Sequence, residues 1–133
     1  MREALALIEV GGGWLLGTLG VLGLLVGSFL NVVIARVPRE ESIVRPGSHC
    51  PACGHVLAWY ENLPLLSWAA LGGRCRACRA PISFRYPAVE LLTGVLFLLG
   101  GWAFGASWEL VRALLLVTFL VPLALIDLEH WIV

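Results

Sequence analysis

Three long apolar segments alternate with polar stretches along the chain. They cover residues 14–35, 88–104 and 110–126. A helix of about 20 apolar residues crosses the hydrocarbon core of a bilayer, and about 17 residues is near the lower limit. Only a short polar turn separates the last two segments, which favours an antiparallel hairpin. The pattern therefore predicts an all-α polytopic membrane protein with three transmembrane helices.

The composition of the 133-residue chain supports this class. Hydrophobic residues make up 59% of the sequence and charged residues 14%, and the mean hydropathy is +0.89. A water-soluble domain normally has about 25% charged residues, so the composition excludes an ordinary soluble fold. Nine arginines balance nine acidic residues, and the net charge of zero therefore carries no functional information.

The first apolar segment has a second interpretation, a cleaved signal peptide. Residues 1–13 lack a clear basic region, the apolar run is longer than a signal peptide needs, and no small-residue cleavage site follows it. We therefore interpret residues 14–35 as a retained transmembrane helix.

The distribution of arginine predicts how the helices are oriented. Seven of the nine arginines lie in residues 36–87, between the first and second helices, and the positive-inside rule places this segment in the cytoplasm. The third helix then returns to the same side, so Asp127, which directly follows it, faces the compartment of segment 36–87. The seven arginines are Arg36, Arg39, Arg45, Arg74, Arg76, Arg79 and Arg85.

All four cysteines lie in this segment as two Cys-x-x-Cys pairs, Cys50 with Cys53 and Cys75 with Cys78. Two such pairs can surround a tetrahedral ion with four thiolates, and this spacing is typical of zinc sites. Disulfides and a redox motif are the competing interpretations. A reducing cytoplasm disfavours both, and no thioredoxin-like βαβ pattern surrounds either pair.

The predicted zinc site has a structural role. Segment 36–87 is rich in proline and has little apolar periodicity, so a closed four-cysteine site can supply the folding energy that a core would otherwise give. With four thiols available, we interpret His49 and His55 as neighbours of the site rather than ligands. We expect a zinc-ribbon-like cytoplasmic loop at 36–87, between an N-terminal part at 1–35 and a final part with the other two helices at 88–133.

Small and polar residues gather on one side of the first helix, within an arc of about 100° at helical periodicity. Such a face lets another helix approach closely, and a polar side chain can hydrogen-bond across the contact. We interpret this face as a packing surface rather than a substrate site. Its residues are Gly13, Gly17, Gly20, Gly27, Ser28 and Asn31.

Glu90, near the start of the second helix, has two interpretations. A carboxylate inside a membrane span is costly unless it is paired or functional. Near a helix N-terminus it also interacts favourably with the helix dipole. Capping and a catalytic or binding role both stay open, and Arg85 is a candidate partner.

Several motifs follow one another in a recognisable order: GSFLNVVIARVP (27–38), CPACGH (50–55), ENLPLLSW (61–68), CRAC (75–78), ISFRYPAVELLTG (82–94) and ALID (124–127). This order resembles the N-terminal portion of bacterial type IV prepilin peptidases, aspartic peptidase family A24. The resemblance implies an inner-membrane aspartic endopeptidase that removes leader peptides from type IV prepilins or type II secretion pseudopilins. Many such enzymes also N-methylate the new N-terminus with S-adenosylmethionine.

On this resemblance, Asp127 matches the first of two catalytic aspartates. One carboxylate activates a water while the other, protonated, donates to the developing oxyanion, because two carboxyls that share a site split their pKa values. The family's second aspartate, in a Gly-x-Gly-Asp motif, is absent from this sequence, and Glu129 lies roughly 200° around a helix from Asp127. We therefore expect this chain alone to be proteolytically inactive. Without the resemblance, Asp127 would be interpreted as a carboxylate at an interfacial helix end.

The predicted cofactors are structural Zn²⁺ and, as a further candidate, S-adenosylmethionine, with Arg85 and Glu90 as its candidate binding residues. The predicted partners are prepilins or pseudopilins and the lipid bilayer, and no nucleic acid. We expect a multi-pass protein of the bacterial inner membrane. The alternative function is a non-catalytic, membrane-anchored zinc module that binds pilin or secretion-system components.

Overall fold

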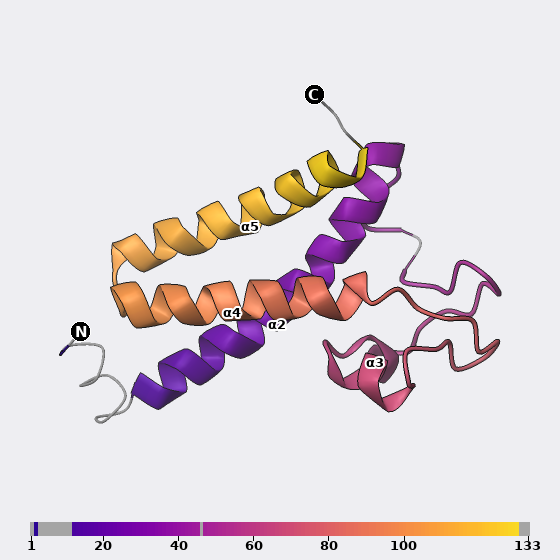
Figure 1. Ribbon diagram of the computed structural model, residues 1–133, viewed down its shortest axis with the longest axis horizontal. Helices are drawn as coiled ribbons and strands as arrows, with labels where there is room; N and C mark the ends of the chain where they lie inside the picture. Colours follow the sequence, from indigo (N-terminus) through magenta and orange to yellow (C-terminus); the bar gives the residue numbers. More distant parts are fainter. Residues whose placement is uncertain (1, 3–11, 46, 131–133) are drawn as a thin grey trace.

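The computed structural model describes residues 2, 12–45 and 47–130, and regular secondary structure within them is helical (Figure 1). Three helices are long and apolar enough to cross a membrane. The predicted all-α class with three transmembrane helices is therefore confirmed. In chain order the elements are α2 (Gly12–Arg36), η1 (Val37–Arg39), η2 (Trp59–Asn62), α3 (Leu66–Ala70), α4 (Arg85–Phe104) and α5 (Trp108–His130).

Local chemistry explains where the second and third long helices begin. α4 starts at Arg85, three residues before the predicted apolar segment, because Pro87 falls in the first helical turn, where its missing N–H is not needed. Before α5, the Ser107 hydroxyl accepts a hydrogen bond from the Leu110 N–H at 3.3 Å. This satisfies one of the free donors at the helix start and fixes where α5 begins.

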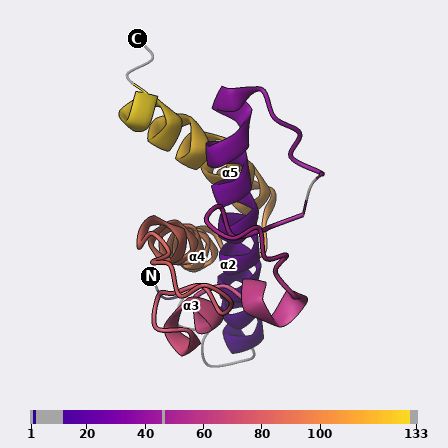
Figure 2. The ribbon, with the colours of Figure 1, turned by 90° about the vertical axis from the view of Figure 1, so that its right-hand side faces the viewer.

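The three long helices form a small bundle in which α2 crosses α4 and α5 returns antiparallel to α4 (Figures 1 and 2). The C-terminal end of α2, the start of α4 and the end of α5 lie at one end of this bundle, on the right of Figure 1. An ion pair between Arg85 and Glu129 joins the start of α4 to the last turn of α5. The loop between α2 and α4 and the end of α5 therefore share one side of the bundle.

Two buried apolar clusters hold the bundle together, and each takes residues from all three long helices. Because these side chains are removed from both water and lipid, close packing between them stabilises the bundle. One cluster consists of Leu30, Ile34, Val89 and Val121, and the other of Leu19, Phe97 and Leu110.

The backbones of α2 and α4 touch at two glycines. A Cβ atom added to Gly23 would lie 2.7 Å from the Gly94 Cα, and one added to Gly27 would lie 2.7 Å from the Glu90 Cα. Gly23 was not included in the predicted packing face, although its spacing from Gly27 is the small-x-x-x-small pattern of close helix pairs. This pattern is the sequence signal that could have located the contact.

The rest of the predicted packing face is partly correct. The Asn31 side chain donates a hydrogen bond to the Tyr86 carbonyl of α4 at 3.0 Å, so a polar group does bridge the two helices. Gly20 lies close to Leu98 of α4, whereas a Cβ on Gly13 or Gly17 would meet no described atom within 4 Å. The part of α2 that packs against α4 therefore begins at Gly20, and it does not include Gly13 or Gly17.

We expect Gly23→Ala to destabilise the helix bundle, whereas Gly17→Ala leaves its stability unchanged or slightly higher. The new methyl group at position 23 meets backbone, which cannot move aside, and overpacking of this kind costs about 1–3 kcal/mol. The same methyl group at position 17 meets open space. Thermal unfolding of both variants in detergent micelles measures the difference, and equal unfolding temperatures would contradict the close α2–α4 contact.

Candidate metal centre and the acidic residues near it

The four cysteines lie on two small knuckles with the same backbone geometry. In each knuckle, the N–H of the first cysteine donates to the carbonyl five residues later, and the N–H four residues after that cysteine donates back to its carbonyl. One isolated β-bridge closes each turn. The bonds are Cys50 N–His55 O at 2.9 Å, Gly54 N–Cys50 O at 2.8 Å, Cys75 N–Ala80 O at 2.9 Å and Arg79 N–Cys75 O at 3.0 Å.

The position after the second cysteine of each pair requires a left-handed backbone. Gly54 has a φ of 75° and Arg79, its counterpart in the second knuckle, has a φ of 64°. Glycine adopts this conformation without steric cost, whereas a residue with a Cβ pays for it. The first knuckle is therefore the less strained of the two.

The four sulfur atoms form a compact group, all within 4.8 Å of one another. Cys50 Sγ lies 3.7 Å from Cys78 Sγ, and Cys53 Sγ lies 3.8 Å from Cys75 Sγ. A tetrahedral zinc ion with Zn–S bonds of about 2.3 Å separates its sulfurs by about 3.8 Å, whereas a disulfide brings them to about 2.05 Å. The arrangement therefore fits one ion held by both knuckles.

The environment of the sulfurs differs between the two knuckles. The backbone amide of Cys78, helped by that of Ala77, lowers the pKa of the Cys75 thiol to about 6. The amide of His55 acts in the same direction on Cys53, but desolvation and the other three sulfurs raise the pKa of the Cys53 thiol to about 12. Four thiolates side by side need a cation, and binding one releases the protons that remain.

Glu61, a buried residue of η2, ties the two knuckles together. Its carboxylate accepts a hydrogen bond from the Ala58 N–H at 2.9 Å and lies 3.0 Å from His55 Nε2, in the first knuckle. Arg76, inside the second knuckle, lies 3.7 Å from the same carboxylate and stacks over the Tyr60 ring. The Ala58 N–H, followed by His55 and Arg76, holds the pKa of Glu61 below its usual range.

Neither histidine of the first knuckle belongs to the sulfur group. The His55 ring faces Glu61, and the His49 Nδ1 lies 3.1 Å from the Gly47 carbonyl. The compact group of potential ligands among the described residues contains four cysteines and no histidine. This agrees with the interpretation of both histidines as neighbours of the site.

We expect Glu61→Gln to loosen the cysteine loop, because an uncharged amide interacts less strongly with His55 and Arg76. Hydrogen bonds to charged groups are stronger than those to neutral groups, and the Glu61 side chain is largely shielded from water. The pKa of Glu61 is lowered in the folded state. The contribution of Glu61 to the stability of the folded loop is therefore complete above the ordinary glutamate pKa of about 4.3, and it disappears as the pH falls through the lowered pKa.

Metal retention under increasing denaturant at pH 7 measures this effect. Glu40→Gln, which changes an exposed glutamate of the same loop, is the matched control. Equal metal loss from the two variants would show that Glu61 does not hold the knuckles together.

Glu90 is buried between the loop and the bundle. Its carboxylate accepts a hydrogen bond from the Leu65 N–H at 2.8 Å, and Leu65 has a φ of 61°, a strained value for a leucine. Of the two interpretations left open for Glu90, capping does not fit, because Glu90 is the sixth residue of α4 and its bond reaches outside that helix. Its predicted partner, Arg85, pairs with Glu129 instead. Glu90 thus anchors the loop to a membrane helix.

Asp127 lies exposed on the last turns of α5, at the edge of an open apolar hollow of about 600 Å³. Glu129, two residues further along α5, pairs with Arg85. The hollow is lined by Leu120, Leu123, Ala124 and Ile126 together with Asp127.

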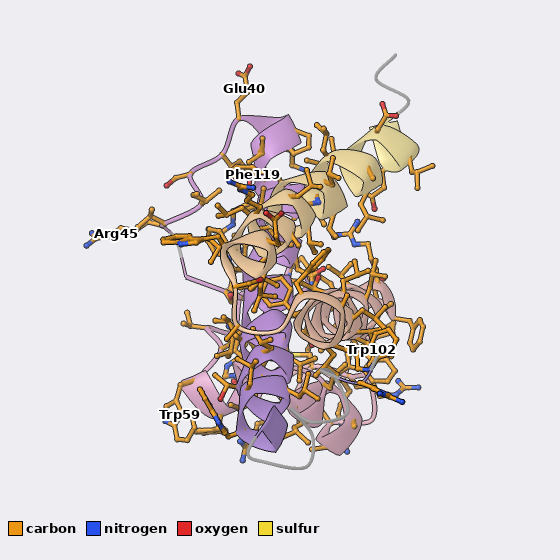
Figure 3. The ribbon with its side chains drawn as sticks, turned by 90° about the vertical axis from the view of Figure 1, so that its left-hand side faces the viewer. Glu40, Arg45, Trp59, Trp102 and Phe119 are labelled. Carbon is orange, nitrogen blue, oxygen red and sulfur yellow. The ribbon has the colours of Figure 1, made fainter. Side chains whose placement is uncertain are left out.

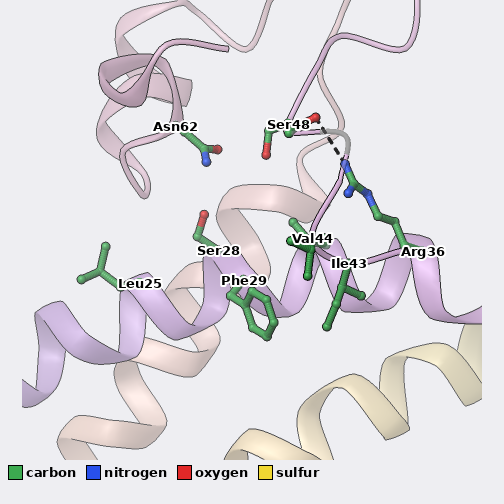
Figure 4. Close-up of a pocket in the computed structure, with 10 residues that line it drawn as sticks. Leu25, Ser28, Phe29, Arg36, Ile43, Val44, Ser48 and Asn62 are labelled. Carbon is green, nitrogen blue, oxygen red and sulfur yellow. Dashed lines mark hydrogen bonds between the residues drawn. The ribbon is translucent and has the colours of Figure 1, made fainter. Parts of the chain in front are cut away.

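A second groove, of about 360 Å³, lies between α2 and the loop residues Ile43, Val44, Gly47 and Ser48 (Figure 4). The Arg36 guanidinium closes one end, since it donates to the Ser42 carbonyl at 3.1 Å and to the Gly47 carbonyl at 3.4 Å. Leu25, Phe29 and Val44 line much of the remainder. Arg36 therefore fixes the start of the loop against α2. From the sequence, Arg36 was predicted only to help orient the helices in the membrane.

Together these features define a multi-pass membrane protein with a four-cysteine loop, suited to a metal ion, between its first two long helices. The sequence profile of the bacterial peptidase A24 N-terminal domain matches residues 21–104. The chain therefore belongs to this family, and the resemblance inferred from its motifs is confirmed.

Curated relatives share this assignment. The chain is 71% identical over 112 residues to the "Prepilin leader peptidase/N-methyltransferase" of Myxococcus xanthus, covering 84% of this chain and 33% of the relative. It is 44% identical over 133 residues to the protein of the same name from Stutzerimonas stutzeri, covering 83% and 46%. The chain thus spans about a third to a half of the length of these relatives. No solved structure matches it.

Proposed function

We propose that this chain is the N-terminal part of an inner-membrane aspartic endopeptidase that removes the leader peptides of type IV prepilins or type II secretion pseudopilins. The observation that carries the proposal is the family match, together with the high identity to a prepilin leader peptidase. The loop between α2 and α4 and the end of α5, the helix that carries Asp127, lie at one end of the bundle, which supports the proposal (Figure 1).

In this proposal Asp127 is one of two catalytic carboxylates. It is the only aspartate in the sequence, and it stands where an apolar hollow on α5 meets the polar end of the bundle. A peptide with an apolar helix could lie in such a hollow and present its scissile bond at the membrane boundary. The partner carboxylate would come from the remainder of a longer protein, since Glu129 is occupied by Arg85.

Cys50, Cys53, Cys75 and Cys78 hold a structural Zn²⁺ in this proposal. The tetrahedral spacing of their sulfurs supports zinc over disulfides, and four protein ligands leave no open position for catalysis. A bound Zn²⁺ would offset two of the four thiolate charges, and the four cysteines would join the two knuckles through it. Segment 36–87 then forms one unit between the helical parts at 1–35 and 88–133.

Methyl transfer is a second activity named for the relatives, and S-adenosylmethionine is its candidate cofactor. Arg85 and Glu90, the two residues considered for its binding, are both engaged within the chain, Arg85 with Glu129 and Glu90 with Leu65. These contacts favour structural roles for both residues.

The orientation proposed here places segment 36–87 and Asp127 in the cytoplasm. Its basis is the arginine distribution, and the common location of these parts at one end of the bundle is compatible with it. The alternative function, a membrane-anchored zinc module that binds pilin or secretion components without cleaving them, uses the same loop and orientation but requires no carboxylate.

The experiment that tests the proposal is cleavage of a purified prepilin by the full-length gene product in lipid vesicles. We expect a product shortened by its leader peptide, detected by mass spectrometry. Binding of the prepilin without any cleavage would favour the alternative module. The Asp127 variant, discussed below, separates a peptidase that uses this carboxylate from one that does not.

A further inference from the structure

The stretch between the two knuckles exposes apolar side chains that neither the knuckles nor the bundle cover. Residues 63–71 are uncharged and largely apolar, and α3 lies at their centre. Leu66 is 70% exposed there, and Trp59, a few residues earlier, is 77% exposed and projects from the edge of the molecule (Figure 3). Large apolar side chains that are exposed close together in sequence point to an interaction surface.

The depth of this stretch along the bundle identifies its surroundings. Leu65 is hydrogen-bonded to Glu90, which lies five residues inside the span that begins at Arg85. At 1.5 Å per residue, this contact lies about 7 Å below the start of the membrane helix. Figures 1 and 2 agree that α3 lies beside the first half of α4. The stretch is therefore level with the outer turns of a transmembrane helix.

The polar side chains of residues 63–71, Ser67 and Trp68, both make hydrogen bonds within the protein, as an apolar environment requires. The Ser67 hydroxyl donates to the Leu63 carbonyl at 2.6 Å, and the Trp68 indole N–H donates to the Ile82 carbonyl at 3.3 Å. Glu61, the nearest preceding charge, is buried and points toward the knuckles. Residues 63–71 thus carry no charged side chain of their own, and the charged group of Arg76 lies over the Tyr60 ring, which contacts Trp59.

The exposed apolar side chains of residues 63–71 also adjoin the start of α4. Phe84, 69% exposed, directly precedes α4 and makes an edge-to-face contact with Trp68, with 5.7 Å between ring centroids. From Phe84 the surface continues onto α4, where Leu91 and Val95 are exposed on a span that crosses the bilayer.

We propose that Trp59, Leu63, Leu66 and Phe84 form an interfacial anchor, which inserts into the boundary between lipid headgroups and acyl chains. Aromatic and leucine side chains are favoured at this depth. The anchor holds the cysteine loop against the bilayer surface, and the bond from Leu65 to Glu90 fixes its depth. The occupant of this surface is lipid, and the inference does not depend on peptidase activity.

The test compares two positions of equal exposure in the full-length protein. An environment-sensitive fluorescent amino acid replaces Leu66 in one variant and Val56 of the first knuckle in the other, since both residues are 70% exposed. The proteins are reconstituted in phosphatidylcholine–phosphatidylglycerol vesicles that contain lipids brominated near the headgroup. We expect several-fold stronger quenching by the brominated lipid at position 66, and several-fold stronger quenching by aqueous iodide at position 56.

Two results would overturn the proposal. Equal quenching of both positions by iodide would show that the stretch is in water, and protection of position 66 from both quenchers would show that protein covers it. A third variant with the fluorophore at Trp59 repeats the comparison independently of Leu66. Metal content equal to that of the unmodified protein shows that each labelled loop is folded.

Discussion

Asp127→Asn in the full-length gene product is expected to abolish leader cleavage, with a loss of about 10³-fold or more in kcat. Removing a general acid–base group typically costs 10²–10⁴-fold, and an asparagine can neither activate water nor share a proton with a second carboxylate. The substitution keeps the shape of the side chain, which is exposed at the end of α5, so folding should be unaffected. Initial rates of prepilin cleavage measure the effect.

Glu109→Gln is the matched control for this variant. Glu109 is an exposed acid at the opposite end of α5, where it pairs with Arg112 at 2.9 Å. Its replacement removes the same charge without approaching the proposed reaction, so cleavage should continue at the parental rate. Near-normal cleavage by Asp127→Asn would rule out this carboxylate as a catalyst and favour the non-catalytic zinc module.

Removal of the metal is expected to unfold the cysteine loop. A structural zinc ion contributes about 10 kcal/mol or more to the folding of a small domain, which is comparable to the whole stability of many domains, about 5–15 kcal/mol. A chelator under reducing conditions should therefore open the loop while the helices remain. The readout is rapid trypsin cleavage at the exposed Arg74, Arg76 and Arg79 of the second knuckle.

Two variants test whether the loss of the metal causes the trypsin sensitivity. Cys75→Ser removes a buried ligand and should give the trypsin-sensitive pattern without a chelator, with less than one zinc ion per chain. His49→Gln changes an exposed neighbour of the site and should retain both the metal and the resistance. Metal-free protein whose cysteines are oxidised in pairs, with an unchanged trypsin pattern, would contradict the zinc assignment.

Features encoded by neighbouring residues were predictable from the sequence. The three spans follow from apolar runs, and the structure extends each by a few residues to Gly12–Arg36, Arg85–Phe104 and Trp108–His130. The sulfur group follows from the Cys-x-x-Cys spacing, because each knuckle is a local turn. In both cases the signal can be read from the sequence alone and needs no knowledge of the tertiary fold.

Contacts between distant segments were not predictable in the same way. Glu61 meets one residue from each knuckle only after both knuckles have come together. The bond from Leu65 to Glu90 joins residues 25 apart in sequence, and the pair of Arg85 and Glu129 joins residues 44 apart. The local sequence marks Glu90 by its place inside an apolar segment, but it does not indicate the partner of any of these acids. Gly23 is the exception, since its spacing from Gly27 carried a usable signal.

The central claim is that the cysteine loop and Asp127 face the same side of the membrane, and labelling with a membrane-impermeant maleimide tests it directly. Cysteines introduced at Ser42 in the loop, at Leu128 beside Asp127 and at Ala106 in the turn between α4 and α5 all replace exposed residues. In inside-out vesicles, whose cytoplasmic face points outward, we predict labelling at 42 and 128 and none at 106. Labelling of 42 and 128 from opposite faces would contradict the account.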